Sequence, residues 1–322
     1  MIKVSNLSKL FGTKKAVNNV SFSVERGEVL GFLGPNGAGK STTMRMITGF
    51  IPPSAGTVAV GGFDMVDNPI PAKQLIGYLP ENAPAYSDMT VWQFLSFTAE
   101  LRGLGGDAKK KAIGRAAELC FLESVLHQSV DTLSKGYRHR TCFAQSIIHD
   151  PDVLVLDEPT DGLDPNQKHE VRQLIKRMGE KKAIIFSTHI LEEVEAACSR
   201  AIIIDRGQIV ANGTPAELKA RSEYAGAISL RVLGVPADTV KARLGGVPGA
   251  RKASIVKEEP TFVWARVYPV KAGGNGLDLA RAVADVARQD NWKIEELHTE
   301  EGRLDEVFRT ITLPDTVKGG QQ

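Results

Sequence analysis

The hydrophobic residues in the first part of the chain form short continuous runs that alternate with amphipathic stretches. Continuous runs predict strands of a parallel sheet that is covered on both faces, and they occur at Val29–Leu33, Val153–Leu156, Ala183–Ser187 and Ala201–Ile204. Between two of these runs, Asn166–Met178 carries apolar residues at helical i, i+3, i+4 and i+7 spacing, namely Val171, Leu174, Ile175 and Met178. Strands that alternate with such helices predict an α/β fold.

A second region begins near Lys219–Gly226, where the composition changes. Its strand-like and helix-like segments follow in the order Ile228–Val232, Ala237–Leu244, Thr261–Tyr268, Leu277–Arg288 and Trp292–Leu297. This βαββαβ-like order predicts a small α+β accessory domain. We therefore expect two domains, residues 1–220 and 221–312, followed by a disordered tail at residues 313–322.

Composition and charge narrow the class of protein. The 322 residues include 40 basic and 38 acidic side chains, a formal net charge of +2, so we expect no nucleic-acid partner, which would favour a basic excess. No stretch approaches the roughly 18 apolar residues that cross a bilayer. The cysteines, Cys120, Cys142 and Cys198, are far apart and odd in number, which fits a reducing cytoplasm and neither a disulfide framework nor a zinc site.

A glycine-rich sequence, GPNGAGKST, follows the first apolar run and precedes a helix. It fits the pattern G-x-x-x-x-G-K-[ST], in which glycines let the backbone N–H groups wrap a phosphate at a helix N-terminus. In this pattern Lys40 reaches the β- and γ-phosphates and the Ser41 hydroxyl is a ligand for Mg²⁺. The predicted nucleotide-binding residues are Gly34, Pro35, Asn36, Gly37, Ala38, Gly39, Lys40, Ser41 and Thr42.

Polar residues follow two of the later apolar runs. Asp157 and Glu158 end the run VLVL, so both carboxylates lie at the C-terminal edge of a buried strand. There an Asp can hold Mg²⁺ through water, and the adjacent Glu can polarise an attacking water. His189 follows the next run and can contact a γ-phosphate. A lone His at such a place is more often structural, but its neighbours here favour a functional role.

The string LSKGYRHR, residues 133–140, contains a second phosphate-binding device. Ser134 and Gly136 precede a helix whose free N–H groups and positive dipole end can point at an anion. The glycine-rich loop already binds the phosphates of one nucleotide, so a second phosphate-binding helix start needs a separate explanation. If it serves a facing subunit, two ATP molecules are each clamped between two chains.

Taken in order, Phe11, GPNGAGKST, YLPEN, LSKGY, VLVLDEP, GLDP and STH resemble the nucleotide-binding subunit of an ABC transporter over about the first 220 residues. The resemblance implies an ABC-type P-loop NTPase domain with a helical subdomain at about residues 82–130. It implies ATP and Mg²⁺ as cofactors, with Ser41, Asp157 and Glu81 at the metal. It further implies that Phe11 stacks on adenine, Glu158 is the general base, His189 is the γ-phosphate switch, Asp164 communicates across the dimer, and Ser134 and Gly136 complete the partner's site.

The strings GYLPENAPAYSDMTV, EPTDGLDPNQ and LDEVFRTIT are similar to ATPases of ABC-2-type exporters, most of all the gliding-motility-type and multidrug-type bacterial subunits. This similarity implies an ATP-hydrolysing subunit at the cytoplasmic face of the membrane, which dimerises with itself or a paralogous ATPase and powers a separately encoded permease. Tyr86 and Trp92, in the expected helical subdomain, either line a groove for a coupling helix of the permease or fill the subdomain's own core.

Two positions depart from the family pattern. The LSKGY string has Lys135 and Tyr137 where Gly and Gln are commonest, although the helix start needs mainly Ser134 and Gly136. Glu81 replaces the usual Gln that contacts Mg²⁺. Its extra charge weakens ATP binding without Mg²⁺ if it faces the metal; alternatively, it points away when no ATP is bound.

Two other functions stay open. A soluble ABC-type ATPase of ribosomes or DNA usually has two nucleotide modules or a long coiled coil, whereas this chain has one module and no heptad run. An ATP-binding switch with weak hydrolysis is disfavoured by the presence of Lys40, Asp157, Glu158 and His189.

Overall fold

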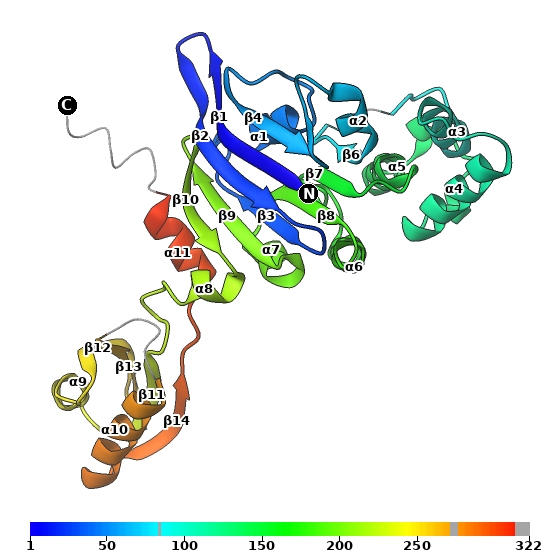
Figure 1. Ribbon diagram of the computed structural model, residues 1–322. Coiled ribbons are helices and arrows are strands. Elements are labelled where there is room, and N and C mark those ends of the chain that lie inside the picture. The colour runs from blue at the N-terminus through cyan, green and yellow to red at the C-terminus, as the bar shows by residue number, and fades with distance from the viewer. Residues whose placement is uncertain (83–84, 271–275, 313–322) are drawn as a thin grey trace. The chain divides into compact units, whose positions relative to one another are not determined.

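The computed structural model describes residues 1–82, 85–270 and 276–312, and the chain divides into two compact units (Figure 1). The first unit is Met1–Thr214 and the second starts at Pro215. Residues 215–220, predicted to end the first domain, therefore begin the second unit. The tail predicted to be disordered, residues 313–322, lies outside the described residues.

A six-stranded sheet in the order β10-β9-β3-β8-β7-β6 forms the centre of the first unit. Its strands are β3 (Val29–Leu33), β6 (Ile76–Leu79), β7 (Val153–Asp157), β8 (Ala183–Thr188), β9 (Arg200–Asp205) and β10 (Gln208–Gly213). All neighbours are parallel except β10, which pairs antiparallel with β9. The four apolar runs are thus strands β3, β7, β8 and β9, as predicted.

Helices cover both faces of this sheet, which explains why its strands are continuously apolar. Val153 and Val155 of β7 belong to the core that includes α1 (Lys40–Ile47), whereas Leu154 and Leu156 belong to the core with α5 (Lys135–Ile147) and α6 (Pro165–Gly179). Since successive strand residues point to opposite faces, a strand between two apolar layers has no polar position. Helix α7 (Leu191–Ala197) contributes Val194 and Ala197 to the buried interior.

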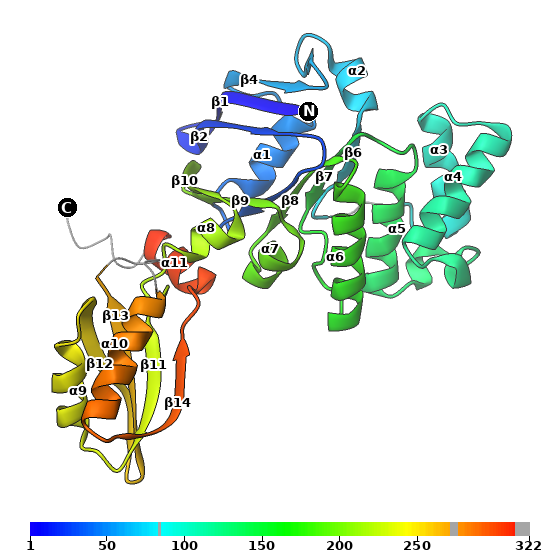
Figure 2. The same ribbon diagram turned by 60° about the horizontal axis from the view of Figure 1, so that its bottom comes forward.

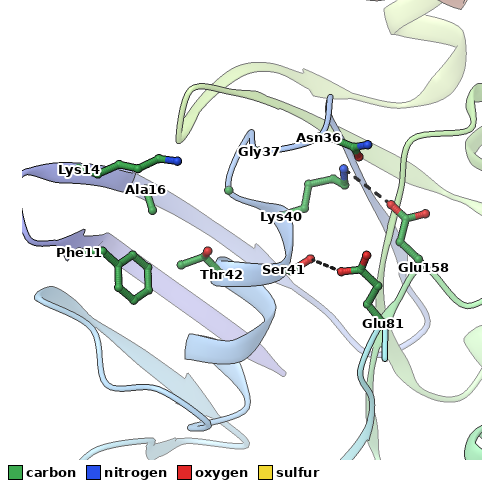
Figure 3. A pocket seen from close by; sticks show the side chains of 11 residues that line it. Phe11, Lys14, Ala16, Asn36, Gly37, Lys40, Ser41, Thr42, Glu81 and Glu158 are labelled. Carbon is green, nitrogen blue, oxygen red and sulfur yellow. Dashed lines mark hydrogen bonds and ion pairs between the residues drawn. The ribbon is translucent and has the colours of Figure 1, made fainter. Parts of the chain in front are cut away.

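A second, antiparallel sheet in the order β2-β1-β4-β5 shares a core with α1. Its strands are β1 (Ile2–Phe11), β2 (Lys14–Val24), β4 (Ala55–Val60) and β5 (Phe63–Asp64), and α2 (Pro69–Gln74) follows. Strands β1 and β2 form a hairpin in which Phe11 pairs with Lys14. This hairpin end places an aromatic ring and a lysine beside the loop that precedes α1 (Figure 3).

The segment between β6 and β7 is helical, as predicted. It contains α3 (Val91–Leu101), α4 (Gly106–Leu119), two 3-10 turns (Glu123–Val125 and Val130–Thr132) and α5. A capping box starts α3: Thr90 Oγ1 accepts from Gln93 N at 3.2 Å, and Gln93 Oε1 accepts from Thr90 N at 2.8 Å. Helices α3, α4 and α5 pack on one another around a shared core.

The second unit has a βαββαβ order; the five segments that the sequence pattern placed are all present, and one strand, Ala250–Glu259, lay outside them. Its core elements are β11 (Ile228–Leu233), α9 (Ala237–Gly245), β12 (Ala250–Glu259), β13 (Phe262–Pro269), α10 (Gly276–Gln289) and β14 (Lys293–Thr299), flanked by α8 (Pro215–Lys219) and α11 (Leu304–Ile311). The sheet order is β12-β13-β11-β14, with all pairings antiparallel. Figure 2 shows α9 and α10 against this sheet. No helix within the described residues is both long and apolar enough to span a membrane.

Candidate active site

The loop between β3 and α1 requires glycine at its last position. Gly39 has φ 107°, in the left-handed region, and a Cβ built there would lie 2.6 Å from the Ala16 carbonyl oxygen. Any other residue would be strained and would clash with the backbone of β2. Within this loop Ala38 N donates to Pro35 O at 3.2 Å. The loop therefore keeps the N-terminus of α1 uncovered by its own side chains.

A cavity of about 360 Å³ lies at this helix start (Figure 3). It is lined by residues of the β1–β2 hairpin, the glycine-rich loop, the start of α1 and the ends of β6 and β7, namely Phe11, Lys14, Ala16, Asn36, Gly37, Gly39, Lys40, Ser41, Thr42, Glu81 and Glu158. Phe11 is 51% exposed, and the Lys9 ammonium lies 5.4 Å from the centroid of its ring. Most of the predicted nucleotide-binding residues thus share one cavity.

The Lys40 side chain is held by its own loop. Its Nζ donates to the carbonyl oxygens of Gly34 at 2.8 Å and Pro35 at 3.3 Å, and it lies 3.7 Å from Oε1 of Glu158. Lys40 is buried, so its charge is only weakly screened by solvent. An anionic phosphate in the cavity would meet an ammonium group that is already in place.

Ser41, Asp157 and Glu81 come together from three elements. Ser41 Oγ donates to Asp157 Oδ1 at 3.2 Å and to Glu81 Oε2 at 3.5 Å. Glu81 therefore faces the predicted metal position and does not point away. The two carboxylates and the hydroxyl are hard oxygen donors of the kind that Mg²⁺ prefers.

Asp157 is buried, and only one of its two carboxylate oxygens has hydrogen-bond partners among the described residues. Its Oδ1 also accepts from Ser187 Oγ, whereas Oδ2 has no hydrogen-bond partner among the described residues. Burial raises the pKa of the Asp157 carboxyl, an effect that the Ser187 and Ser41 hydrogen bonds oppose. A buried carboxylate oxygen without a partner is costly unless something else satisfies it. The residues present thus fit a Mg²⁺ ion, which Ser41, Asp157 and Glu81 would hold.

Glu158 occupies a strained position directly after β7. Its φ is 51°, in a region that residues other than glycine rarely adopt and that is enriched at functional sites. Its Oε2 lies 3.0 Å from Nδ1 of His189, while its Oε1 faces Lys40. Burial raises the pKa of the Glu158 carboxyl, against the lowering by His189 and Lys40. A carboxylate with a raised pKa is a stronger base.

His189 follows β8 and its side chain is half exposed. It contacts the site through Glu158 and is not itself among the residues that line the cavity. The sequence motif that contains it also supplies Ser187, whose Oγ binds both Asp157 Oδ1 and the main-chain N of Glu158. Sequence reasoning gave Ser187 no role, although it is the first residue of the STH string that contains His189.

The remaining predicted residues gather outside the cavity, at the starts of α5 and α6. Ser134 caps α5, accepting from Tyr137 N at 3.3 Å, and Asp164 caps α6, accepting from Gln167 N at 2.9 Å. The Gln167 amide lies over Gly136, where a Cβ would be 2.5 Å from its Oε1. Ser134, Gly136 and Asp164 do not line the cavity. Lys14 and Ala16, which do line it, were not predicted because the Lys14–Lys15 pair has no motif around it.

Known proteins resemble this chain along most of the first unit. The linearmycin resistance ATP-binding protein LnrL of Bacillus subtilis is 37% identical over 237 residues, which cover 73% of this chain and 76% of LnrL. The chain belongs to the ABC transporter ATP-binding proteins. A sequence profile described as ABC transporter matches residues 17–161 of this ABC ATP-binding protein, and a profile described as an AAA domain matches residues 129–195.

Another relative and a solved structure agree with this family assignment. A multidrug ABC transporter ATP-binding protein of Escherichia coli K12, YbhF, is 40% identical over 223 residues, which cover 69% of this chain but only 38% of YbhF. A structure titled as the ATP binding subunit of an ABC transporter has a TM-score of 0.63 and 28% identity, covering 68% of this chain and 92% of that one. The predicted family and fold are confirmed, and the names of these relatives agree with the predicted exporter-type branch.

Proposed function

We propose that this ABC ATP-binding protein hydrolyses ATP and thereby powers export through a separately encoded permease. The observation that supports this proposal best is that Lys40 and Glu158 line one cavity. Asp157 joins them through Ser41, and His189 joins them through Glu158. In parallel α/β sheets the C-terminal ends of the strands are the usual ligand-binding edge. Within this group, the Glu158 carboxylate contacts both the Lys40 ammonium and the His189 ring.

The residues divide the chemistry among them. The main-chain N–H groups of Gly34 and residues 36–42, together with the Lys40 ammonium, bind the phosphates, and Phe11 stacks on the adenine ring. Ser41, Asp157 and Glu81 hold Mg²⁺, which neutralises charge on the phosphates when it is bound. Glu158 accepts a proton from the attacking water, while His189 orients the water and the γ-phosphate from the end of β8.

A second copy of the chain, or a paralogous ATPase, completes each site. Ser134 is exposed at the start of α5 and lies outside its own chain's cavity. An uncovered helix N-terminus suits a phosphate, and a facing subunit can offer one. Asp164 and Gln167 brace the same helix start from α6, so the group forms one surface.

The test combines hydrolysis with assembly. Parent protein should hydrolyse ATP in the presence of Mg²⁺, and Glu158→Gln should abolish turnover and form a stable dimer with Mg-ATP on size-exclusion chromatography with light scattering. Adding Ser134→Arg to this variant should prevent dimerisation but preserve ATP binding. Ser124→Arg, at another exposed serine, should leave both dimerisation and ATP binding unchanged. A strictly monomeric Glu158→Gln protein, even beside its permease, would refute the proposed site.

The helical subdomain is the proposed permease contact. Tyr86 is 54% exposed and packs edge-on against Phe94 and Phe97, with ring centroids 6.2 and 5.7 Å away. Trp92 is half-buried, packs on the core and faces His127. Tyr86→Ala with Trp92→Ala should lower transport and spare basal ATPase. An equal loss of stability and ATPase would instead assign both rings to the subdomain core.

The site of action is the cytoplasmic face of the membrane, where the chain is a peripheral subunit. A steady-state ATPase assay with and without membranes that contain the permease separates this function from the alternatives. A soluble ATPase would ignore the membranes, and a switch that binds ATP would show dimerisation without turnover. Stimulation of turnover by the permease supports coupling.

A further inference from the structure

Helix α5 carries a buried histidine whose ring is unsatisfied. His139 is 7% exposed, and neither Nδ1 nor Nε2 has a hydrogen-bond partner among the described residues. Buried polar groups nearly always have partners, because leaving one unpaired costs free energy. A ring with two unpaired nitrogens therefore requires an explanation beyond packing.

The ring faces the segment that carries Glu158. Lys135 and His139 are four residues apart and share one side of α5. Lys135 Nζ lies 3.1 Å from Asp161 Oδ2, and the main chain of Glu158 lies beside the His139 ring, close enough to affect its ionisation. One face of the helix thus contacts the turn from Glu158 to Asp161 at both ends.

The His139 ring is neutral at physiological pH. Burial lowers its pKa most, Lys135 lowers it further, and Asp161 and the Glu158 main chain raise it in part. A neutral imidazole has one N–H donor and one acceptor nitrogen. It can therefore donate one hydrogen bond to a carbonyl without bringing a charge into the core.

The turn opposite has a suitable acceptor. The Glu158 carbonyl oxygen already accepts from Asp161 N at 3.1 Å, and a carbonyl oxygen has a second lone pair. The backbone at Glu158 is in the left-handed region, at φ 51°. Such a conformation persists only where surrounding contacts hold it. A donor from α5 would add one such contact directly at the strained residue.

We propose that His139 is a positioning residue for Glu158: a small movement of the ring lets its N–H donate to the Glu158 carbonyl oxygen, and this contact holds the carboxylate toward the attacking water. This inference rests on the proposed role of Glu158 as general base. His139 acts through Glu158 and touches no substrate.

Three variants on α5 test the proposal. His139→Leu removes the donor and fills the space, His139→Gln keeps a donor, and Cys142→Ala perturbs the packing of the same helix away from the turn. We expect His139→Leu to lower kcat about 3- to 10-fold, the effect of one hydrogen bond, with KM for ATP unchanged and the melting temperature equal or higher. His139→Gln should recover most of kcat, and Cys142→Ala should lower the melting temperature with little change in kcat.

Other results would overturn the proposal. An unchanged kcat in His139→Leu would exclude the contact. A fall in kcat together with the melting temperature, as in a packing defect, would assign the histidine a structural role, and so would a Gln variant no better than Leu. Absence of ATPase in the parent, or activity that survives Glu158→Gln, would refute the proposed function itself and would be seen before any His139 variant is compared.

Discussion

Replacing Glu81 with Gln removes one negative charge beside Ser41 and keeps the side-chain length. Glu81 and Asp157 both accept from Ser41 Oγ, at 3.5 and 3.2 Å. Burial is the main cause of the raised pKa of Asp157, and Glu81 raises it further by repulsion. A phosphate that reaches Ser41 would meet the same carboxylate at a similar distance.

The size of the effect follows from the geometry. Two unit charges about 7 Å apart, the most that the shared Ser41 allows, repel by about 0.6 kcal/mol at the dielectric constant of water and about 2.4 kcal/mol at an effective value near 20. Glu81 is exposed, so the lower part of this range applies. Without Mg²⁺, Glu81→Gln should therefore bind ATP about 3- to 10-fold more tightly. With Mg²⁺ the gain should vanish, because the cation compensates the charge.

Calorimetric titration with ATP, in EDTA and in Mg²⁺, measures this difference. Both titrations use the Glu158→Gln background so that hydrolysis does not consume the ligand. Glu81→Asp keeps the charge and should resemble the parent in EDTA. If Glu81→Gln changed affinity equally in both buffers, or in neither, the carboxylate would not face the phosphate and metal as the Ser41 contact indicates.

Three further predictions concern local structure. Gly39→Ala should destabilise the first unit by about 2–4 kcal/mol in urea unfolding and weaken ATP binding, because backbone strain adds to a steric clash. At Gly37 the φ is 80° but no atom lies within 4 Å of the new Cβ, so Gly37→Ala should cost only about 1 kcal/mol in the same measurement. Thr90→Ala should cost about 1 kcal/mol by loss of the capping box, seen as a lower melting temperature with ATP affinity unchanged. Glu300→Gln should destabilise the second unit by about 3 kcal/mol, because Arg266, 2.7 Å from Glu300 and equally buried, loses its counter-charge. Burial raises the pKa of Glu300, but Arg266 and its neighbours lower it below the ordinary 4.5. The stability that this ion pair contributes is therefore present above pH 4.5 and is lost as the pH falls through the lower pKa of the folded protein. A urea midpoint that did not fall on acidification would contradict the pairing.

Short-range patterns determined the elements and motifs. The apolar run Val153–Leu156 is a strand because both of its faces are buried, and Thr90 with Gln93 starts a helix through contacts three residues apart. The loop before Lys40 is recognisable because its glycines meet local backbone requirements. These features depend on neighbours along the chain, so the sequence alone predicts them.

The β1–β2 hairpin shows where such patterns end. Its residues alternate irregularly, with register shifts along β1, so no clean period marks it, and Lys14 reaches the cavity only because the hairpin folds over the start of α1. In the second unit the sequence pattern predicted the order of elements along the chain but not the strand order of the sheet, β12-β13-β11-β14. That order depends on how the strands pack together.

Only the tertiary structure decided how the motifs meet. Along the chain, Ser41 is 40 residues from Glu81 and 116 residues from Asp157, yet it contacts both. The order of the strands in the sheet brings the three residues together. The same packing leaves Ser134 outside the cavity of its own chain and places the buried His139 ring beside the Glu158 main chain. Contacts between distant segments depend on which strands become neighbours, and that choice depends on the packing of the whole unit, which local spacing does not encode.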